Sequence, residues 1–341
     1  MKKNPRWFGQ SILLLIGLLV LFLIDISLGA VKISLSEIFT VLARNENSSS
    51  ASNIIWLFRL PKAVTCIVAG AALATGGLMM QTFFRNPLAG PDVLGLSAGA
   101  SLMVAILILA GQRVLFLADL LANPWAIAAA ASLGCMLVFL FIISIAKRVR
   151  DNTTLLVIGL MLSAATISIV SVLQYMSTAE DLQAFVIWTF GSVGNTSWKE
   201  IAVLSSVVLI AGAMAFSSIK PLNTWLLGEN YAQSLGINIK RSRLIIVSAT
   251  GLLVGAVTAF CGPIAFVGLA VPNLVRIIVP SSNHKILIPA VMMGGAILLL
   301  FCDIVAQLPE SSKILPVNAV TSLVGAPVVI WIIMRSKTIR I

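Results

Sequence analysis

The sequence predicts an all-α polytopic membrane protein with ten transmembrane helices and both termini in the cytoplasm. Hydrophobic residues make up 59% of the 341 positions and charged residues only 10%, whereas soluble domains carry about 25% charged residues. The apolar runs are continuous rather than alternating, which excludes a β-barrel. A spanning helix needs about 20 mostly apolar residues and satisfies its own backbone in lipid. The connectors are too short for a further soluble domain, so we expect residues 1–341 to form a single transmembrane domain.

Ten apolar runs, taken in chain order, are long enough to be interpreted as spans. They cover residues 11–29, 63–82, 93–111, 125–146, 154–173, 201–217, 244–260, 264–279, 286–305 and 315–334. The first run follows a basic start and precedes small residues near Ala30, so it also fits a cleavable signal peptide, which would leave nine spans. Small residues in the second and seventh spans predict close approach of neighbouring helices; they are Gly70, Ala71, Ala74, Gly76, Gly77, Gly251, Gly255 and Ala259.

The distribution of basic residues predicts the orientation. A net charge of +11 would suggest a nucleic-acid partner for a soluble protein, but in a membrane protein the side on which the charges lie matters more than their sum. With the N-terminus inside, the outer segments hold only seven of the 23 basic residues, namely Lys32, Arg44, Arg59, Lys62, Arg113, Lys199 and Lys313. We therefore expect cytoplasmic termini, lipid as a partner and no nucleic acid.

The sequence lacks the common motifs for bond chemistry. It has no phosphate-binding loop, no HExxH or GxSxG motif, and a single histidine, His284. The four cysteines, Cys66, Cys135, Cys261 and Cys302, all fall within predicted spans without CxxC spacing, so we interpret them as buried packing residues rather than metal ligands. We expect no catalytic residue, no metal site and no cofactor bound by this chain.

Acidic residues are almost absent from the predicted spans. Only Asp25 and Asp303 fall there, near the outer ends of their helices. Carriers driven by ion gradients usually need ionisable residues near the bilayer midplane. We therefore interpret both carboxylates as partners of helix ends or of a neighbouring cation, and we expect another chain to supply energy for transport.

The outer segment before the second span contains a polar stretch, residues 45–53, that predicts a flexible loop. Arg59 and Lys62 follow it and flank Pro61, where the second span is expected to begin. These cations either anchor the helix end among lipid headgroups or bind an acidic partner.

The longest inner connector, residues 221–243, predicts a short amphipathic helix from Trp225 to Leu235 that ends at Gly236. Such a helix could lie on the membrane surface or contact a soluble partner. Its polar residues, Glu229, Asn230 and Gln233, are not the lysine-rich face of a lipid binder, which favours a protein contact.

Four sequence blocks together resemble the FecCD-type permeases of ABC importers for iron chelates, haem and cobalamin. "RLPKAVTCIVAGAALATGGLMMQTFFRNPLAGPDVLGLSAGASL" resembles the most recognisable block of that family. "LLGENYAQSLGINI", "GPIAFVGLAVPNLVR" and "LPVNAVTSLVGAPVVIWII" resemble three further blocks, in the same order. The resemblance covers nearly the whole chain and implies a type II importer permease in the bacterial cytoplasmic (inner) membrane.

The resemblance implies that this chain transports without catalysing a reaction. Two permease subunits, here expected as a homodimer, would enclose the path, two cytoplasmic ATPase subunits would bind ATP and Mg²⁺, and an extracytoplasmic substrate-binding protein would deliver the cargo. The expected cargo is a metal chelate, with a ferric siderophore favoured over haem or cobalamin. The alternative from another functional class is an ion-coupled secondary transporter.

The resemblance also implies roles for particular residues. It places the ATPase contacts at Glu229, Ala232, Leu235 and Gly236, and the contacts for the binding protein at Arg59, Lys62 and Lys313. It places the cytoplasmic gate at Asn86, Leu88, Asn152 and Thr153. Candidate residues lining the path are Thr154, Ser163, Thr166, Trp188 and Phe190.

Two residues depart from the family pattern. Asn273 stands where the family usually has histidine, so proton exchange at this position is not expected. Asn318 replaces a common glycine, which we expect to stiffen the start of the last span.

Overall fold

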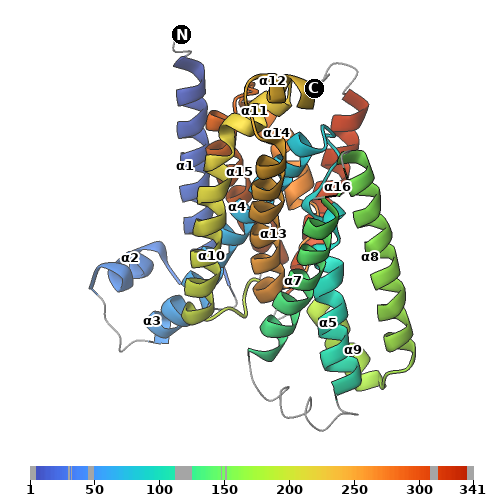
Figure 1. Cartoon of the computed structure of the whole chain (residues 1–341). Helices are drawn as coiled ribbons and strands as arrows, with labels where there is room; N and C mark the ends of the chain where they lie inside the picture. Colours follow the sequence, from blue (N-terminus) through green and yellow to red (C-terminus); the bar gives the residue numbers. More distant parts are fainter. Residues whose placement is uncertain are drawn as a thin grey trace.

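The computed structural model describes residues 5–29, 31, 33–44, 50–111, 125–146, 148–149, 152–307 and 314–335, and this part of the chain folds into a bundle of helices (Figure 1). In chain order the helices are α1 (Pro5–Ser27), α2 (Leu35–Arg44), α3 (Ser50–Ile54), η1 (Ile55–Arg59), α4 (Leu60–Phe83), η2 (Pro91–Leu94), α5 (Leu96–Gly111), α7 (Ala126–Ala146), α8 (Asn152–Tyr175), α9 (Ala179–Thr189), α10 (Trp198–Ser217), α11 (Ile219–Trp225), α12 (Glu229–Ser234), α13 (Ile239–Cys261), α14 (Val267–Ile278), α15 (His284–Ala306) and α16 (Val317–Arg335).

Each of the ten predicted spans coincides with a helix. Among the described residues, seven helical stretches are long and apolar enough to cross a membrane, and they contain α1, α4, α7, α8, α10, α13 and α15. The apolar parts of α5, α14 and α16 are shorter, at 10–17 residues. The chain is therefore a multi-pass membrane protein, while the count of ten spans stays a prediction.

The second span begins earlier than its proline suggested. Residues 50–53, predicted as part of a flexible loop, form most of α3, and one continuous helical stretch runs from Ser50 to Phe83. Pro61 is the second residue of α4 and follows η1, a π-helical turn. A proline lacks the N–H group and its ring crowds the carbonyl four residues earlier. A wider π turn is a common way for a helix to accommodate such an interruption.

The inner connector forms two short helices rather than one. We expected a helix from Trp225 to Leu235, but α11 ends at Trp225 and α12 begins at Glu229. Gly228, between them, has a φ of 110°, which other residues rarely adopt. Gly236, with a φ of 77°, follows the end of α12 as predicted.

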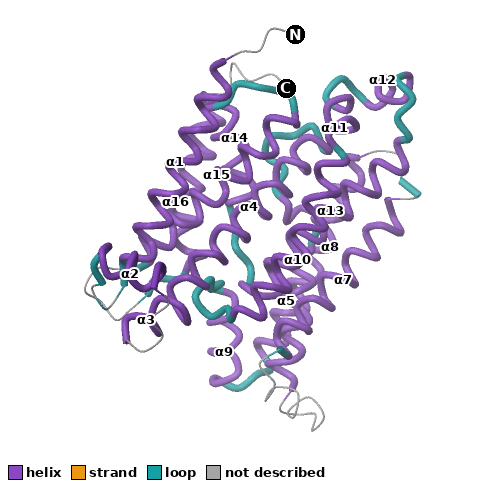
Figure 2. The backbone as a smooth tube through the Cα atoms, turned by 90° about the vertical axis from the view of Figure 1, so that its left-hand side faces the viewer, coloured by secondary structure: helices purple, strands orange, loops and turns teal. Residues whose placement is uncertain are grey.

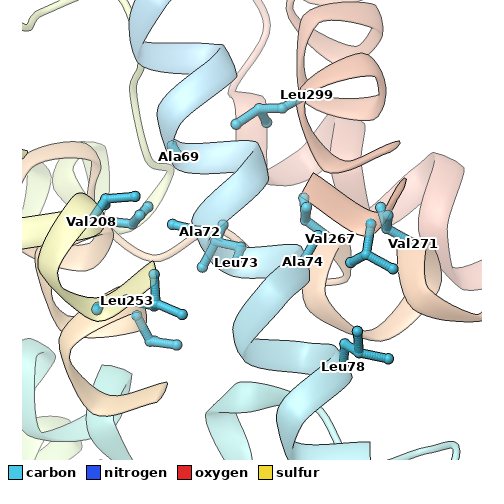
Figure 3. Packing of buried hydrophobic residues seen from close by; sticks show 14 of the residues in the cluster. Ala69, Ala72, Leu73, Ala74, Leu78, Val208, Leu253, Val267, Val271 and Leu299 are labelled. Atoms are coloured by element: carbon cyan, nitrogen blue, oxygen red, sulfur yellow. The ribbon is translucent and has the colours of Figure 1, made fainter. Parts of the chain in front are cut away.

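The core of the bundle is built around α4. In the helical stretch Ser50–Phe83, which contains α4, 83% of an 18-residue apolar segment is buried. In Figure 3, Val208 of α10 and Leu253 of α13 approach α4 from one side, and Leu299 of α15 and Val267 and Val271 of α14 approach it from the other. Burial on both sides explains why α4 reads as apolar throughout rather than on one face.

Glycine allows the closest of these helix contacts. A Cβ atom at Gly77 would overlap the carbonyl oxygen of Gly268 in α14, and one at Gly70 would overlap that of Gly295 in α15. A Cβ atom at Gly251 would lie 2.6 Å from the ring of Phe139 in α7. The prediction that small residues in the second and seventh spans allow close packing is confirmed.

The connecting segments divide between the two ends of the bundle. Helix α1 begins and α16 ends at the end where α11 and α12 lie (Figure 1). Helices α2, α3 and α9 lie at the opposite end (Figure 2). We call these the coupling end and the outer end, after the roles that the sequence predicts for their segments.

Candidate coupling and gating sites

The segment around α12 presents three large apolar side chains to the surrounding space. Leu227, Tyr231 and Leu235 follow one another at intervals of four residues and are 64%, 49% and 50% exposed. Tyr231 and Leu235 are one helical turn apart and lie on one side of α12, whereas Leu227 precedes Gly228 and stands just before this helix. Of the predicted ATPase contacts, Leu235 is exposed, Glu229 is half-buried and Gly236 has open space around it.

Ala232 does not fit its predicted role as an ATPase contact. It is fully buried and belongs to the hydrophobic core. One helical turn carries both inward and outward positions, so the residue after the exposed Tyr231 points toward the bundle. Leu227 and Tyr231, which were not predicted as contacts, are exposed instead. Their spacing of four residues in the sequence is the pattern that could have identified them.

A cavity of about 420 Å³ lies between α12 and the ends of two long helices. It is lined by Phe83, Phe84, Arg85, Asn152, Thr153, Trp225 and Glu229. The structure thus brings two predicted gate residues, Asn152 and Thr153, together with a predicted coupling residue, Glu229. No residue pattern in the sequence indicates this cavity, because its walls come from four separate segments.

Two buried polar atoms on side chains that line this cavity have no hydrogen-bond partner among the described residues. They are the Nε1 of Trp225 and the Oδ1 of Asn152. The amide nitrogen of Asn152 is engaged, since it donates to the carbonyl oxygen of Phe83 at 3.0 Å. The Trp225 ring packs edge-on against Phe83, with 5.2 Å between ring centroids.

The turn after α4 holds the other two predicted gate residues. The side-chain oxygen of Asn86 accepts the backbone N–H of Leu88 at 2.9 Å, which is the local bond of an Asx turn. The Leu88 side chain is 45% exposed. Neither residue lines the cavity, so the structure separates the predicted gate into an Asn86–Leu88 turn and the start of α8.

Asn273 fastens this turn to α14. Its amide nitrogen donates to the carbonyl oxygens of Pro87 at 3.0 Å and Leu269 at 2.9 Å. Gln81 and Arg276 extend the network, with Nη1 of Arg276 donating to Oε1 of Gln81 at 2.6 Å. Asn273 therefore has a structural function, which is to bind the backbone of the Asn86–Leu88 turn at Pro87.

His284 connects α11 to the body of the bundle. Its Nε2 lies 2.8 Å from the hydroxyl of Thr82 in α4, and its Nδ1 lies 2.8 Å from the amide oxygen of Asn223 in α11. The ring is 1% exposed. This histidine, which we did not assign to a site from the sequence, is therefore a buried link between three helices.

A buried charge cluster lies at the outer end. Lys62 Nζ is 2.7 Å from Oδ2 of Asp303 and 3.5 Å from Oδ1 of Asp25, and Gln307 donates to both carboxylates. Asp25 is fully buried and Asp303 is 2% exposed. The expectation that these two carboxylates have a cation as their partner is confirmed, and Lys62 is that cation.

The structure does not support the predicted docking role of Arg59 and Lys62. Arg59 is 5% exposed and its guanidinium donates to the carbonyl oxygens of Ile26, Ser27 and Val31. Free carbonyls at the end of α1 attract a cation, and the two carboxylates hold Lys62 in the same way. Both charges are thus used inside the protein. Lys313, the third predicted contact, lies outside the described residues.

The candidate path-lining residues differ in their surroundings. Ser163 and Thr166 donate to carbonyl oxygens four residues earlier in α8, and Thr166 is buried. Thr154 is exposed in the first turn of α8. In α9, Trp188 stacks on Phe185 and is half-buried, while Phe190 just after α9 is 44% exposed. The buried position of Thr166 does not fit a role in lining an open path, because its side chain packs within the chain.

Asn318 joins three segments at the start of α16. Its Oδ1 accepts the backbone N–H of Ala265 at 3.0 Å, and its backbone N–H donates to the carbonyl of Phe190 at 3.1 Å. We expect Asn318→Gly to lower the stability of the protein by about 1–2 kcal/mol, because the N–H of Ala265 loses its partner. Thermal unfolding in detergent measures this loss. Ala319→Gly, at an exposed neighbouring position, is the control for the flexibility of glycine, and an equal loss in both variants would contradict the prediction.

The buried cysteines do not form a metal site in the described part of the chain. Cys66, Cys135, Cys261 and Cys302 are all buried free thiols. No group of three or more potential ligands from histidine, cysteine, aspartate or glutamate is found among the described residues.

The chain is similar to known permeases over almost its whole length. The chain is 34% identical over 337 residues to the vitamin B12 import system permease protein BtuC of Klebsiella pneumoniae subsp. pneumoniae, covering 98% of this chain and 96% of that protein. It is 33% identical over 329 residues to the hemin transport system permease protein HmuU of Yersinia pestis, covering 96% and 97%. A solved structure, an inward-facing metal-chelate type ABC transporter, superposes with a TM-score of 0.83 at 27% identity and covers 96% of this chain and 98% of that one.

The model of the FecCD transport family matches residues 17–335. Its permeases are membrane subunits, and separate ATPase subunits hydrolyse ATP for them. With this match over almost its whole length, the chain belongs to the FecCD transport family.

Proposed function

We propose that this chain is the permease subunit of an ATP-driven importer that takes up a metal chelate. The observation that carries the proposal is the similarity over almost the whole chain to permeases named for vitamin B12 and hemin import. The exposed apolar side chains of Leu227, Tyr231 and Leu235 at the coupling end support the proposal, because they are available to a partner subunit.

The cargo is proposed as a class, a metal ion held in an organic chelator. The two relatives are named for a cobalamin and a haemin system at nearly equal identity, 34% and 33%, so identity alone does not choose between them. The ferric siderophore predicted from the sequence is a third member of the class. Uptake of each labelled chelate by the same vesicles would decide between the three.

The importer would work with three kinds of partner. ATPase subunits would bind the surface formed by Leu227, Tyr231 and Leu235, and would carry ATP and Mg²⁺. A substrate-binding protein would bind at the outer end, near α2, α3 and α9. A second copy of this chain would complete the path. The basic residues favour a cytoplasmic position for the coupling end in a bacterial inner membrane.

Transport driven by ATP can be distinguished from transport driven by an ion gradient. The chain would be co-expressed with candidate ATPase and binding-protein subunits, purified as a complex and reconstituted in proteoliposomes. We expect chelate uptake only when ATP is enclosed on the ATPase side. Uptake by the chain alone that stops when a proton or sodium gradient is dissipated would instead identify a secondary transporter. The buried, ion-paired state of Asp25 and Asp303 favours the first outcome.

The gate prediction is tested by leak. Replacing both Asn86 and Leu88 with alanine removes the bond that shapes the turn and shortens its exposed side chain. We expect a severalfold faster escape of trapped chelate from proteoliposomes that hold resting transporter without ATP. Leu209→Ala, at a position 73% exposed on α10, is the control. A leak equal to that of the control would remove the gate role from this turn.

A further inference from the structure

We propose that Arg243 is a positioning residue that transmits movement of α12 to the gate segment at the start of α8. The inference rests on the proposed function and adds a residue to it. Arg243 lies in the second turn of α13 and is 6% exposed. Among the described residues it bonds to Glu229 of α12 and to carbonyl oxygens at the end of α7.

The first contact is with the coupling segment. Nη2 of Arg243 lies 3.2 Å from Oε1 of Glu229, the first residue of α12. Glu229 is half-buried and stands two residues before Tyr231, whose side chain is exposed to a partner. A partner that shifts α12 therefore moves the carboxylate on which Arg243 is held.

The second contact is with the end of α7. Nη1 of Arg243 donates to the carbonyl oxygens of Val149 at 2.6 Å and Ala146 at 3.4 Å. Carbonyls at a helix C-terminus lack partners within the helix and carry partial negative charge, so they attract a guanidinium. Because this guanidinium is buried, breaking its bond to Glu229 or to these carbonyls costs more free energy than the same break would in water.

The third step leads from α7 to the predicted gate. Val149 precedes Asn152, the first residue of α8, by three positions. The amide nitrogen of Asn152 donates to the carbonyl oxygen of Phe83, and the Asn86–Leu88 turn begins three residues after Phe83. Glu229, the partner of Arg243, lines the same cavity as Asn152, and the bond from Asn152 to Phe83 joins this region to the segment that leads to the Asn86–Leu88 turn.

The cavity lined by Asn152, Trp225 and Glu229 leaves space for α12 to move. Asn152, Trp225 and Glu229 line it together, and the side chains of Asn152 and Trp225 leave Oδ1 and Nε1 unpaired among the described residues. Buried polar atoms without partners are costly. A second arrangement, in which the movement of α12 gives these two atoms partners, would lower that cost. Two discrete packings of one contact region are what coupling between distant sites requires.

The experiment follows the gate directly, so it does not depend on the identity of the cargo. A spin label is attached at Thr153→Cys, an exposed position, in the transporter assembled with its ATPase subunits. The native cysteines, which are buried, remain unlabelled. In the unsubstituted background we expect ATP to change the distance between the labels of the two permease subunits. With Arg243→Gln we expect that change to be lost while ATP hydrolysis continues.

The chelate taken up per ATP hydrolysed is the second measurement. We expect it to fall about tenfold in Arg243→Gln, within the usual range of coupling free energies. Glu229→Gln should fall in the same direction. The double variant should be no worse than Arg243→Gln, because both changes break one route. Arg241→Gln, two positions away and exposed, is the control and should keep both measurements unchanged.

The outcomes separate this inference from the proposed function. A label at position 153 that responds to ATP in Arg243→Gln as it does without that substitution overturns the role of Arg243. If Arg243→Gln does not fold, Glu229→Gln breaks the same pair from the other side. Normal coupling and a normal response of the label in that folded variant also overturn the role. Failure of the unsubstituted transporter to bind ATPase subunits or to take up any chelate instead contradicts the proposed function.

Discussion

Replacing Lys62 with methionine is expected to destabilise the protein by about 3–5 kcal/mol, the usual cost of removing one partner from a buried ion pair. Lys62 is the cation that pairs with both Asp25 and Asp303, which are 0% and 2% exposed. Without it, two carboxylates that share Gln307 as a neighbour would face each other in an apolar surrounding. Unfolding by heat or denaturant in detergent micelles, followed by circular dichroism, measures the loss.

Two further variants make this prediction specific. Lys199→Met removes an exposed cation at the outer end and should leave the stability nearly unchanged. Adding Asp303→Asn to Lys62→Met should restore part of the stability, because one of the two unpaired charges is removed. A loss no larger than that of Lys199→Met would contradict the assignment of Lys62 to this cluster.

Gly77→Ala is expected to prevent α4 and α14 from packing at their present distance. A Cβ atom at this position would overlap the backbone carbonyl of Gly268, which cannot turn aside as a flexible side chain could. Overpacking of a core typically costs about 1–3 kcal/mol, and occasionally more. We expect a clear drop in the unfolding temperature and loss of assembled transporter on size-exclusion chromatography.

The matched control is Gly212→Ala in α10. No atom lies within 4 Å of a Cβ atom placed there, and alanine is the better helix former. This variant should be as stable as the unsubstituted protein or slightly more so. Equal behaviour of the two alanine variants would show that α4 and α14 can separate without cost.

The positions of the helices could be predicted from the sequence because lipid imposes a simple requirement on length and polarity. All ten predicted spans coincide with helices, with ends displaced by a few residues. The exceptions have local causes. The π turn η1 let the helix continue through Pro61, and the backbone at Gly228 split the inner connector into α11 and α12.

The partners of individual charges could not be predicted in the same way. Lys62 meets Asp303 across 241 positions of sequence and Asp25 across 37, and no pattern of spacing relates them. Arg59 was expected to face a partner protein, but it donates instead to carbonyl oxygens at the end of α1. The Glu229–Arg243 pair, by contrast, joins residues 14 positions apart, and a search for oppositely charged residues within the inner connector would have found it.

The burial of α4 has a consequence for how the protein tolerates variation. Of an 18-residue apolar segment, only 17% is buried in α1 and 22% in α8, against 83% in the helix that contains α4. In a library of all single substitutions, α1 and α8 should therefore tolerate changes at their exposed positions, which recur at each helical turn. In the same library, α4 should tolerate few changes at any position, and natural sequence variation in this segment should be scarce on every side of the helix.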